Sequence, residues 1–230
     1  MPIRNRILAL LAAGFGLAPM AVAQAQPVVV ELFQSQGCSS CPPADANLNA
    51  IADRPDVLAL SFAVTYWDDL GWKDTFASSQ FTARQYAYAR GLGHPNVATP
   101  QIVINGRHDL VGNDRRELDV AIRAAGQPAG AALEIAGGAV QVAAGPAPAR
   151  GADVWLVRYD PRVQWVAIRR GENGGKTLPH RDIVRQVVRL GVWFGTARSF
   201  PLPGGGGPGL KTAILVQTAD GGPILAAAKL

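Results

Sequence analysis

Residues 28–43 read VVVELFQSQGCSSCPP, and this stretch decides the fold. Its first six residues are mainly β-branched or apolar and predict a buried strand. A polar segment then leads into Cys38-Ser39-Ser40-Cys41, which contains the only two cysteines of the chain. A helical pattern follows over residues 44–51, with apolar side chains on one face. The sequence therefore places a Cys-x-x-Cys pair at a strand-to-helix junction.

The spacing of the cysteines favours redox chemistry over a purely structural bridge. In the chain-entropy model a loop this short contributes only about 2 kcal/mol to stability, against about 5 kcal/mol for a loop of about 100 residues. A redox pair needs one thiol that ionises readily and a second that resolves the mixed disulfide. Cys38 precedes the helix, where backbone N–H groups favour a thiolate. We therefore assign Cys38 as the nucleophile and Cys41 as the resolving thiol.

Other chemistries lack their motifs. Two thiolates without a neighbouring histidine or third cysteine leave a zinc ion half ligated, so we expect no metal. Residues 171–177, GENGGKT, have one residue too few between their glycines for a phosphate-binding loop, and a proline follows. We expect no cofactor and no nucleic-acid partner. We also expect His94, His108 and His180 to be ordinary loop or surface residues.

Downstream of the cysteines the pattern alternates between strands and helices. The predicted elements are a strand at 57–66, a helix at 76–90, strands at 101–104 and 108–111, and a helix capped by Asn113. Asn105-Gly106 predicts the hairpin between the last two strands. A helix between parallel strands, followed by an antiparallel hairpin, is α/β organisation. This is the element order of the thioredoxin fold.

Residues 126–130, GQPAG, mark a predicted domain boundary. Beyond it, short apolar runs alternate with turn residues, as in an antiparallel β-sandwich. The runs lie at 132–135, 140–143, 154–159, 163–168, 183–190, 212–218 and 224–228. We expect a thioredoxin-like α/β domain over residues 27–127. We expect residues 131–230 to form a β-rich, sandwich-like domain that packs against the first without contributing thiol chemistry.

The first 25 residues predict a signal peptide. Arg4 and Arg6 precede an apolar segment at 7–17 that is too short to span a bilayer comfortably, and small residues at 21–25 supply a cleavage site. We therefore expect a periplasmic or secreted protein with no membrane attachment after cleavage. The alternative is an uncleaved membrane anchor.

Four segments carry a resemblance to known proteins. They are residues 30–44 (VELFQSQGCSSCPPA), 66–73 (YWDDLGWK), 99–106 (TPQIVING) and 170–173 (RGEN). The chain resembles the thioredoxin superfamily in general, and more closely the secreted thioredoxin-like family catalogued as domain of unknown function 1223. The resemblance covers nearly the whole mature chain. It implies the fold, and it implies no particular reaction because that family has none established.

The thioredoxin pattern also assigns roles near the cysteines. It implies that Pro100 is a cis proline facing the sulfurs and that Thr99 offers its backbone to an extended substrate segment. Glu31 lies close to the position of the buried thioredoxin acid, one residue further from the cysteine. Two interpretations of Glu31 stay open, a proton relay and a solvent-facing side chain.

The chain departs from ordinary thioredoxins around the motif. Gly37 replaces a tryptophan, Ser39-Ser40 replaces Gly-Pro, and Pro42-Pro43 removes two N–H donors at the helix start.

Trp67, Asp68 and Trp72 follow the second predicted strand at its C-terminal end, where open α/β sheets bind ligands. They form either a substrate rim or lid, or a packed loop whose tryptophans cover the core.

Two hypotheses of function follow. The first is an exported thiol–disulfide oxidoreductase that uses Cys38 and Cys41 on protein thiols or disulfides, or on a periplasmic redox partner. The alternative is a non-catalytic periplasmic binding or interaction module with an inert disulfide.

Overall fold

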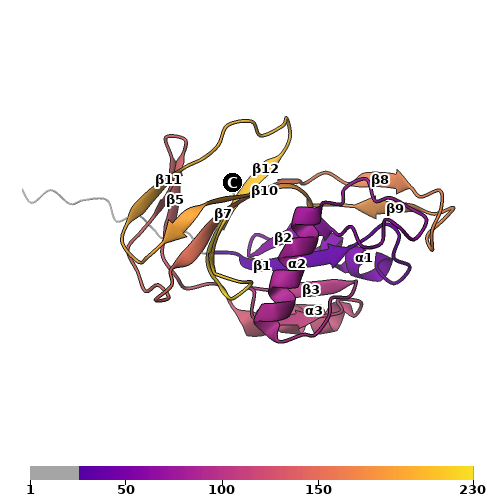
Figure 1. Ribbon diagram of the computed structural model, residues 1–230, viewed down its shortest axis with the longest axis horizontal. Helices are drawn as coiled ribbons and strands as arrows, with labels where there is room; N and C mark the ends of the chain where they lie inside the picture. Colours follow the sequence, from indigo (N-terminus) through magenta and orange to yellow (C-terminus); the bar gives the residue numbers. More distant parts are fainter. Residues whose placement is uncertain (1–25, 230) are drawn as a thin grey trace, which may run out of the picture.

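The computed structural model describes residues 26–229 (Figure 1). The predicted signal peptide, residues 1–25, lies outside the described residues. Within them the chain is a mixed α/β structure with three helices and one large sheet, so the predicted mixed α/β class is confirmed. None of the described helices has the length and apolar character needed to cross a membrane.

The first half of the chain holds all three helices. Its elements are β1 (Val28–Gln34), α1 (Pro42–Ile51), β2 (Val57–Ala63), α2 (Ser79–Leu92), β3 (Gln101–Ile104), β4 (His108–Leu110) and α3 (Arg115–Ala125). Strand β1 pairs in parallel with β2 and antiparallel with β3. Asn105 and Gly106 have the positive φ angles of the predicted hairpin turn, 49° and 62°. The N-cap of α3 is Asp114 instead of the predicted Asn113, because the Asp114 carboxylate accepts hydrogen bonds from two backbone N–H groups.

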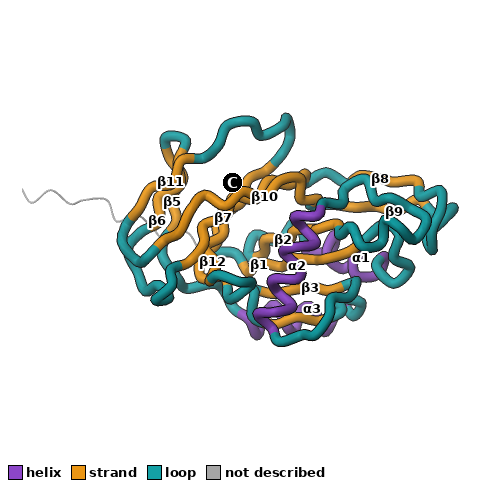
Figure 2. Tube along the Cα trace, in the orientation of Figure 1, coloured by secondary structure: helices purple, strands orange, loops and turns teal. Residues whose placement is uncertain are grey.

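The second half consists of strands and loops. Its elements are β5 (Leu133–Ala136), β6 (Ala139–Val142), β7 (Ala152–Asp160), β8 (Gln164–Ala167), β9 (Thr177–His180), β10 (Ile183–Trp193), β11 (Arg198–Pro201), β12 (Lys211–Thr218) and β13 (Ile224–Lys229). Figure 2 shows the helices near the middle of the molecule beside β1, β2 and β3, with β5, β6 and β11 toward one end and β8 and β9 toward the other.

A single eight-stranded sheet crosses the predicted boundary at 126–130. Its strand order is β13-β12-β7-β10-β2-β1-β3-β4. Strands β10 and β2 meet where Ile183 pairs with Ser61, and the Ser61 N–H donates to the carbonyl of Asp182 at 2.8 Å. The boundary therefore does not separate two sheets. Whether residues 27–127 fold alone stays a prediction.

Alternating side chains of the large sheet build a core on each of its faces. Val30 and Leu32 of β1 pack with α1 and α3, while Val29 and Phe33 pack with α2 and with strands of the second half. A three-stranded sheet, β11-β6-β5, covers the far end and buries Trp193 in a third cluster. Strands β8 and β9 form a separate hairpin near α1. Strand β1 therefore packs against helices of the first half and against strands of the second half.

Candidate functional site

Cys38 and Cys41 form a disulfide between the end of β1 and the start of α1. The Cys38 N–H donates to the carbonyl of Ser35 at 3.1 Å, and the Cys41 N–H donates to the carbonyl of Cys38 at 3.2 Å. These bonds turn the chain from the strand into the helix and hold the two Cα atoms 5.5 Å apart. The cysteines are thus placed by local backbone structure.

The start of α1 offers few N–H groups to the sulfurs. Cys41 is the N-cap residue, and Pro42 and Pro43 open the helix without an N–H to donate. The Asp45 N–H donates to the carbonyl of Cys41 at 3.1 Å and is therefore occupied. A thiolate at Cys38 consequently has weaker helix-terminus stabilisation than an ordinary helix start provides.

Both cysteines are completely buried, although Ser39 and Ser40 between them are exposed. The Cys38 sulfur lies 3.3 Å from the hydroxyl oxygen of Ser40 and 3.8 Å from the carbonyl oxygen of Thr99. The Thr99–Pro100 peptide bond is cis. The sulfurs are thus enclosed without a direct path to solvent.

The two tryptophans of the predicted rim reach this enclosure. The Trp67 indole N–H donates to the Thr99 hydroxyl oxygen at 2.8 Å, and the Trp72 indole N–H donates to the Gln36 side-chain oxygen at 2.9 Å. Asp68 lies one step further out, because its carboxylate accepts from the backbone N–H of Asp74. The structure therefore links Trp67 to Cys38 through Thr99, ties Trp72 to Gln36 just before the cysteines, and leaves Asp68 in a supporting position.

A loop from the second half completes the enclosure. Residues 168–176, here called the cap loop, connect β8 to β9. The buried amide group of Asn173 donates to the carbonyl oxygen of Cys38 at 2.8 Å and to that of Gln36 at 3.0 Å. The Glu172 carboxylate accepts from the backbone N–H of Ser39 at 3.0 Å, which lowers the pKa of Glu172. Residues 131–230 therefore contact the cysteine turn directly, and whether they contribute to its thiol chemistry stays a prediction.

A buried histidine lies against the other side of α1. His180 is 1% exposed, so the expectation of a surface residue is wrong. Its Nδ1 lies 3.7 Å from a carboxylate oxygen of Asp45, an ion-pair distance too long for a hydrogen bond. Burial favours neutral imidazole, but Asp45 and Asp74 outweigh it and raise the pKa of His180. Burial in turn raises the pKa of Asp45 against the opposing effect of His180. The pair of Asp45 and His180 therefore lies at the first turn of α1, the helix that begins after Cys41.

Glu31 is buried in a different network. The Arg84 guanidinium donates to both of its carboxylate oxygens, at 2.8 and 3.1 Å, and the Tyr88 hydroxyl also bonds to it. The solvent-facing interpretation of Glu31 is therefore wrong. No hydrogen bond within residues 26–229 joins Glu31 to either cysteine.

Across the described residues, no group of three or more His, Cys, Asp or Glu side chains is arranged to hold a metal ion.

A family model and two solved structures match the chain. A family model described as protein of unknown function (DUF1223) matches residues 29–217. The crystal structure of protein AGR_C_4864 from Agrobacterium tumefaciens is 35% identical, with a TM-score of 0.73 over 90% of this chain and 95% of that one. HBP35 of Porphyromonas gingivalis is 14% identical, with a TM-score of 0.58 over 90% of this chain and 75% of that one, and shares the fold alone. No curated protein matches the sequence.

Proposed function

This chain belongs to the family described as protein of unknown function (DUF1223), which names no reaction, and we propose from its site that it is an exported thiol–disulfide oxidoreductase. The Cys38–Cys41 disulfide at the start of α1 is the observation that carries this proposal. Protein thiols or disulfides, or a periplasmic redox partner, are the proposed substrates.

The chemistry follows from thiol–disulfide exchange. A substrate thiolate attacks the Cys38 sulfur, the Cys38–Cys41 bond breaks, and Cys41 leaves as a thiolate that takes up a proton. A second substrate thiolate attacks the substrate sulfur of the mixed disulfide and releases Cys38, which is protonated in turn. The substrate loses two electrons and forms a disulfide, while the cysteine pair gains them. The reverse sequence reduces a substrate disulfide.

We propose a thioredoxin-like relationship for residues 27–127. The support is the order β1, Cys-x-x-Cys, α1, β2, α2, β3, β4 and α3, with β2 parallel and β3 antiparallel to β1. A Cys-x-x-Cys pair beside a β-α-β unit is typical of such redox domains. The carbonyl of Thr99, 3.8 Å from the Cys38 sulfur, lies where an extended substrate segment would pair.

Exchange at Cys38 requires the enclosure to open, because the residue has no exposed surface. The cap loop is the segment whose displacement would release it, since Asn173 and Glu172 hold the cysteine turn by side-chain hydrogen bonds alone. Release of these bonds exposes the turn without breaking a strand of the large sheet. The cap loop therefore controls access in the proposed mechanism.

Complete burial of both cysteines also favours a second candidate function. In that alternative the protein is a binding or interaction module whose disulfide stays oxidised and inert. The two candidates differ in the thiols of the reduced protein: an oxidoreductase presents one reactive thiol of lowered pKa, and a structural bridge presents none.

Alkylation of the reduced chain separates the candidates. We expect iodoacetamide to modify Cys38 faster than Cys41, with a pH midpoint below the free-thiol pKa of about 8.5. The matched control is the urea-unfolded protein, in which both thiols should react alike. Equal slow reaction of both cysteines in the folded protein would support the inert disulfide, and faster reaction at Cys41 would reverse the roles.

A further inference from the structure

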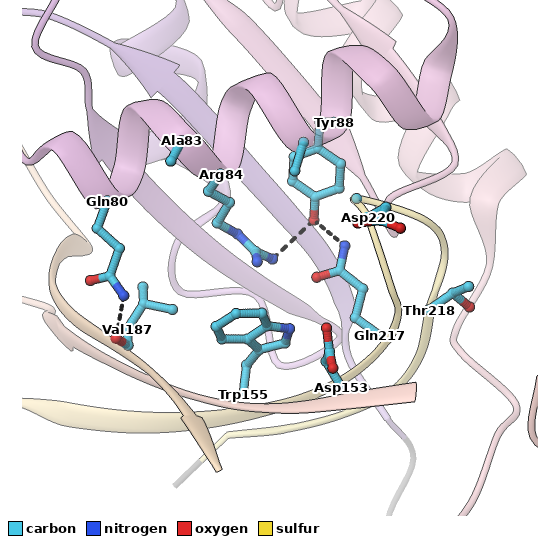
Figure 3. Close-up of a pocket in the computed structure, with 12 residues that line it drawn as sticks. Gln80, Ala83, Arg84, Tyr88, Asp153, Trp155, Val187, Gln217, Thr218 and Asp220 are labelled. Carbon is cyan, nitrogen blue, oxygen red and sulfur yellow. Dashed lines mark hydrogen bonds between the residues drawn. The ribbon is translucent and has the colours of Figure 1, made fainter. Parts of the chain in front are cut away.

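A cavity of about 270 Å³ lies between α2 and the strands of the second half, and no cysteine lines it. Figure 3 shows Arg84 and Tyr88 descending into it from α2, with Trp155 of β7 below and Gln217 of β12 facing them. The volume falls just below the roughly 300–1,000 Å³ of sites for drug-sized ligands, so an occupant must be smaller than a drug.

The Arg84 guanidinium brings unused donors to this cavity. Its side chain is only 9% exposed. Nε and Nη2 donate to Glu31, and Nη2 also donates to the Tyr88 hydroxyl oxygen at 3.0 Å. Nη1 has no hydrogen-bond partner among residues 26–229, and it is not among the fully enclosed atoms that lack one. Its two N–H groups are therefore available to a ligand.

Gln217 brings an unused acceptor. The residue is 2% exposed, and its Nε2 donates to the Tyr88 hydroxyl oxygen at 3.1 Å and to the carbonyl of Gly222 at 2.9 Å. These bonds fix the orientation of the amide, so its oxygen points into the space between Arg84 and Trp155 (Figure 3). That oxygen has no hydrogen-bond partner in the described part of the chain. It is also absent from the fully enclosed atoms that lack a partner, so it is open to the cavity and can accept from water or a ligand.

The remaining walls suit a flat molecule. The Trp155 ring lies beneath the guanidinium, with its centroid 5.9 Å from the Arg84 carbon Cζ. Ala83 and Ala87 of α2 add small apolar side chains to the lining. The 5.9 Å between the guanidinium carbon and the indole centroid leaves no room for a ring between them, so a planar group packs against the indole beside the guanidinium and meets one donor and one acceptor at its edge.

The charges favour a neutral ligand. Glu31 neutralises Arg84, with carboxylate–guanidinium distances of 2.8 and 3.1 Å. Asp153 pairs with Arg189 at 2.7 Å, and Asp220 stands exposed at the rim. An anion would meet the Asp220 carboxylate without finding a free cation. A neutral group that offers a carbonyl oxygen and an N–H side by side satisfies Arg84 Nη1 and Gln217 together.

We propose that this cavity binds a small, neutral, planar molecule through an amide edge, either a carboxamide or a lactam ring. The carbonyl oxygen accepts from Arg84 Nη1, the N–H donates to the Gln217 oxygen, and the ring packs against Trp155 beside the guanidinium. This site goes beyond the proposed redox function and requires no change at the cysteines.

The test is calorimetric titration of the whole chain with benzamide, accompanied by the ¹⁵N–¹H spectrum of the tryptophan indoles. We expect benzamide to bind with a Kd of about 1 mM or tighter, and benzoate, which lacks the donor and is charged, to bind at least about tenfold more weakly. Trp155→Leu, and Ala83→Leu, which fills the cavity without removing a hydrogen bond, should each weaken benzamide at least about tenfold. Trp165→Leu, the same change at a 68% exposed tryptophan outside the cavity, is the control and should bind like the unaltered chain.

Three results would overturn the proposal. These are no heat and no shift of the Trp155 indole signal at 10 mM benzamide, about equal affinity for benzoate, or undiminished binding by folded Trp155→Leu and Ala83→Leu proteins. Circular dichroism confirms that each variant is folded before its titration is interpreted.

Discussion

The side-chain amide of Asn173 donates a hydrogen bond of 2.8 Å to the carbonyl oxygen of Cys38, across a sequence separation of 135 residues. The bond links the β-rich half to the turn that holds the dithiol. Because Asn173 also donates to the carbonyl of Gln36, one buried side chain holds both ends of the segment from Gln36 to Cys38. Access to Cys38 therefore depends on a residue far from it in sequence.

The first prediction concerns this bond. Asn173→Ala removes both hydrogen bonds and leaves the Gln36 carbonyl without a partner, while the Cys38 carbonyl keeps the N–H of Cys41. This weakens the closed cap loop by about 1–3 kcal/mol. We expect dithiothreitol to reduce the disulfide about tenfold faster or more in this variant, since 1.4 kcal/mol corresponds to a factor of ten. Asn47→Ala is the matched control, because Asn47 makes an equally short bond of 2.8 Å to Gly112. Equal reduction rates in Asn173→Ala and the unaltered protein would mean that the cap loop does not control access.

The second prediction concerns redox poise. Pro42 and Pro43 deprive the helix start of N–H donors, so the Cys38 thiolate gains little stabilisation and the dithiol form is not strongly favoured. We expect a potential nearer the thioredoxin value of about −270 mV than the strongly oxidising value of about −120 mV. Equilibration with glutathione buffers measures it. A value at the oxidising end would indicate a dedicated disulfide donor and contradict the helix-start argument.

The third prediction concerns the buried ion pair of Arg84 and Glu31. Arg84→Met leaves the Glu31 carboxylate buried without a cation, and we expect a loss of about 3–5 kcal/mol in the free energy of unfolding. Adding Glu31→Gln removes the stranded charge and should recover part of the loss. Urea unfolding followed by tryptophan fluorescence measures both variants. A loss below about 1 kcal/mol in the single variant, or no recovery in the double variant, would show that Glu31 is not held as a buried anion.

The fourth prediction concerns pH. Burial raises the pKa of Asp182 to about 7, against the opposing charges of Arg181 and Lys211. The folded state therefore binds this proton more tightly than the unfolded chain, whose aspartates titrate at about 3.9. The resulting stability is fully present below about pH 4 and is lost as the pH rises through about 7.

Asp182→Asn removes this dependence and tolerates the positive φ of 51° at the position. The fall in unfolding free energy between pH 4 and pH 8 should shrink in the variant by several kcal/mol, and by no more than about 4. His180, with its raised pKa, contributes in the same direction and stays in both proteins, so the difference between the two curves isolates Asp182. An equal fall in unfolding free energy in both proteins would contradict the raised pKa of Asp182.

The sequence predicts the elements whose pattern is local. The strand from Val28, the Asn105-Gly106 turn and the apolar face of α3 follow from alternation, turn chemistry and helical spacing. Two strands escaped prediction, β9 and β11. Strand β9 contains Pro179, and β11 buries only Phe200, so neither shows a clear period of two.

The residues of the candidate site also fall into two groups, those that local sequence predicts and those that only the fold brings into place. Cys38, Cys41 and Thr99 belong to continuous motifs, whereas Asn173 reaches the site only through the fold of the β8–β9 hairpin. The RGEN segment at 170–173 was the available signal, because it is one of the four segments that carry the family resemblance. His180 carried no signal, since a single buried histidine leaves no pattern in a sequence.

The fifth prediction tests the central claim, redox exchange at Cys38. Cys41→Ala leaves Cys38 without its resolving thiol, so a mixed disulfide that forms there should persist. We expect mass spectrometry of the folded variant, incubated with glutathione disulfide, to find one glutathione on Cys38, while Cys38→Ala acquires none on Cys41 at the same time point. An unmodified Cys38 in folded Cys41→Ala, under conditions that modify the urea-unfolded variant, would contradict the oxidoreductase account.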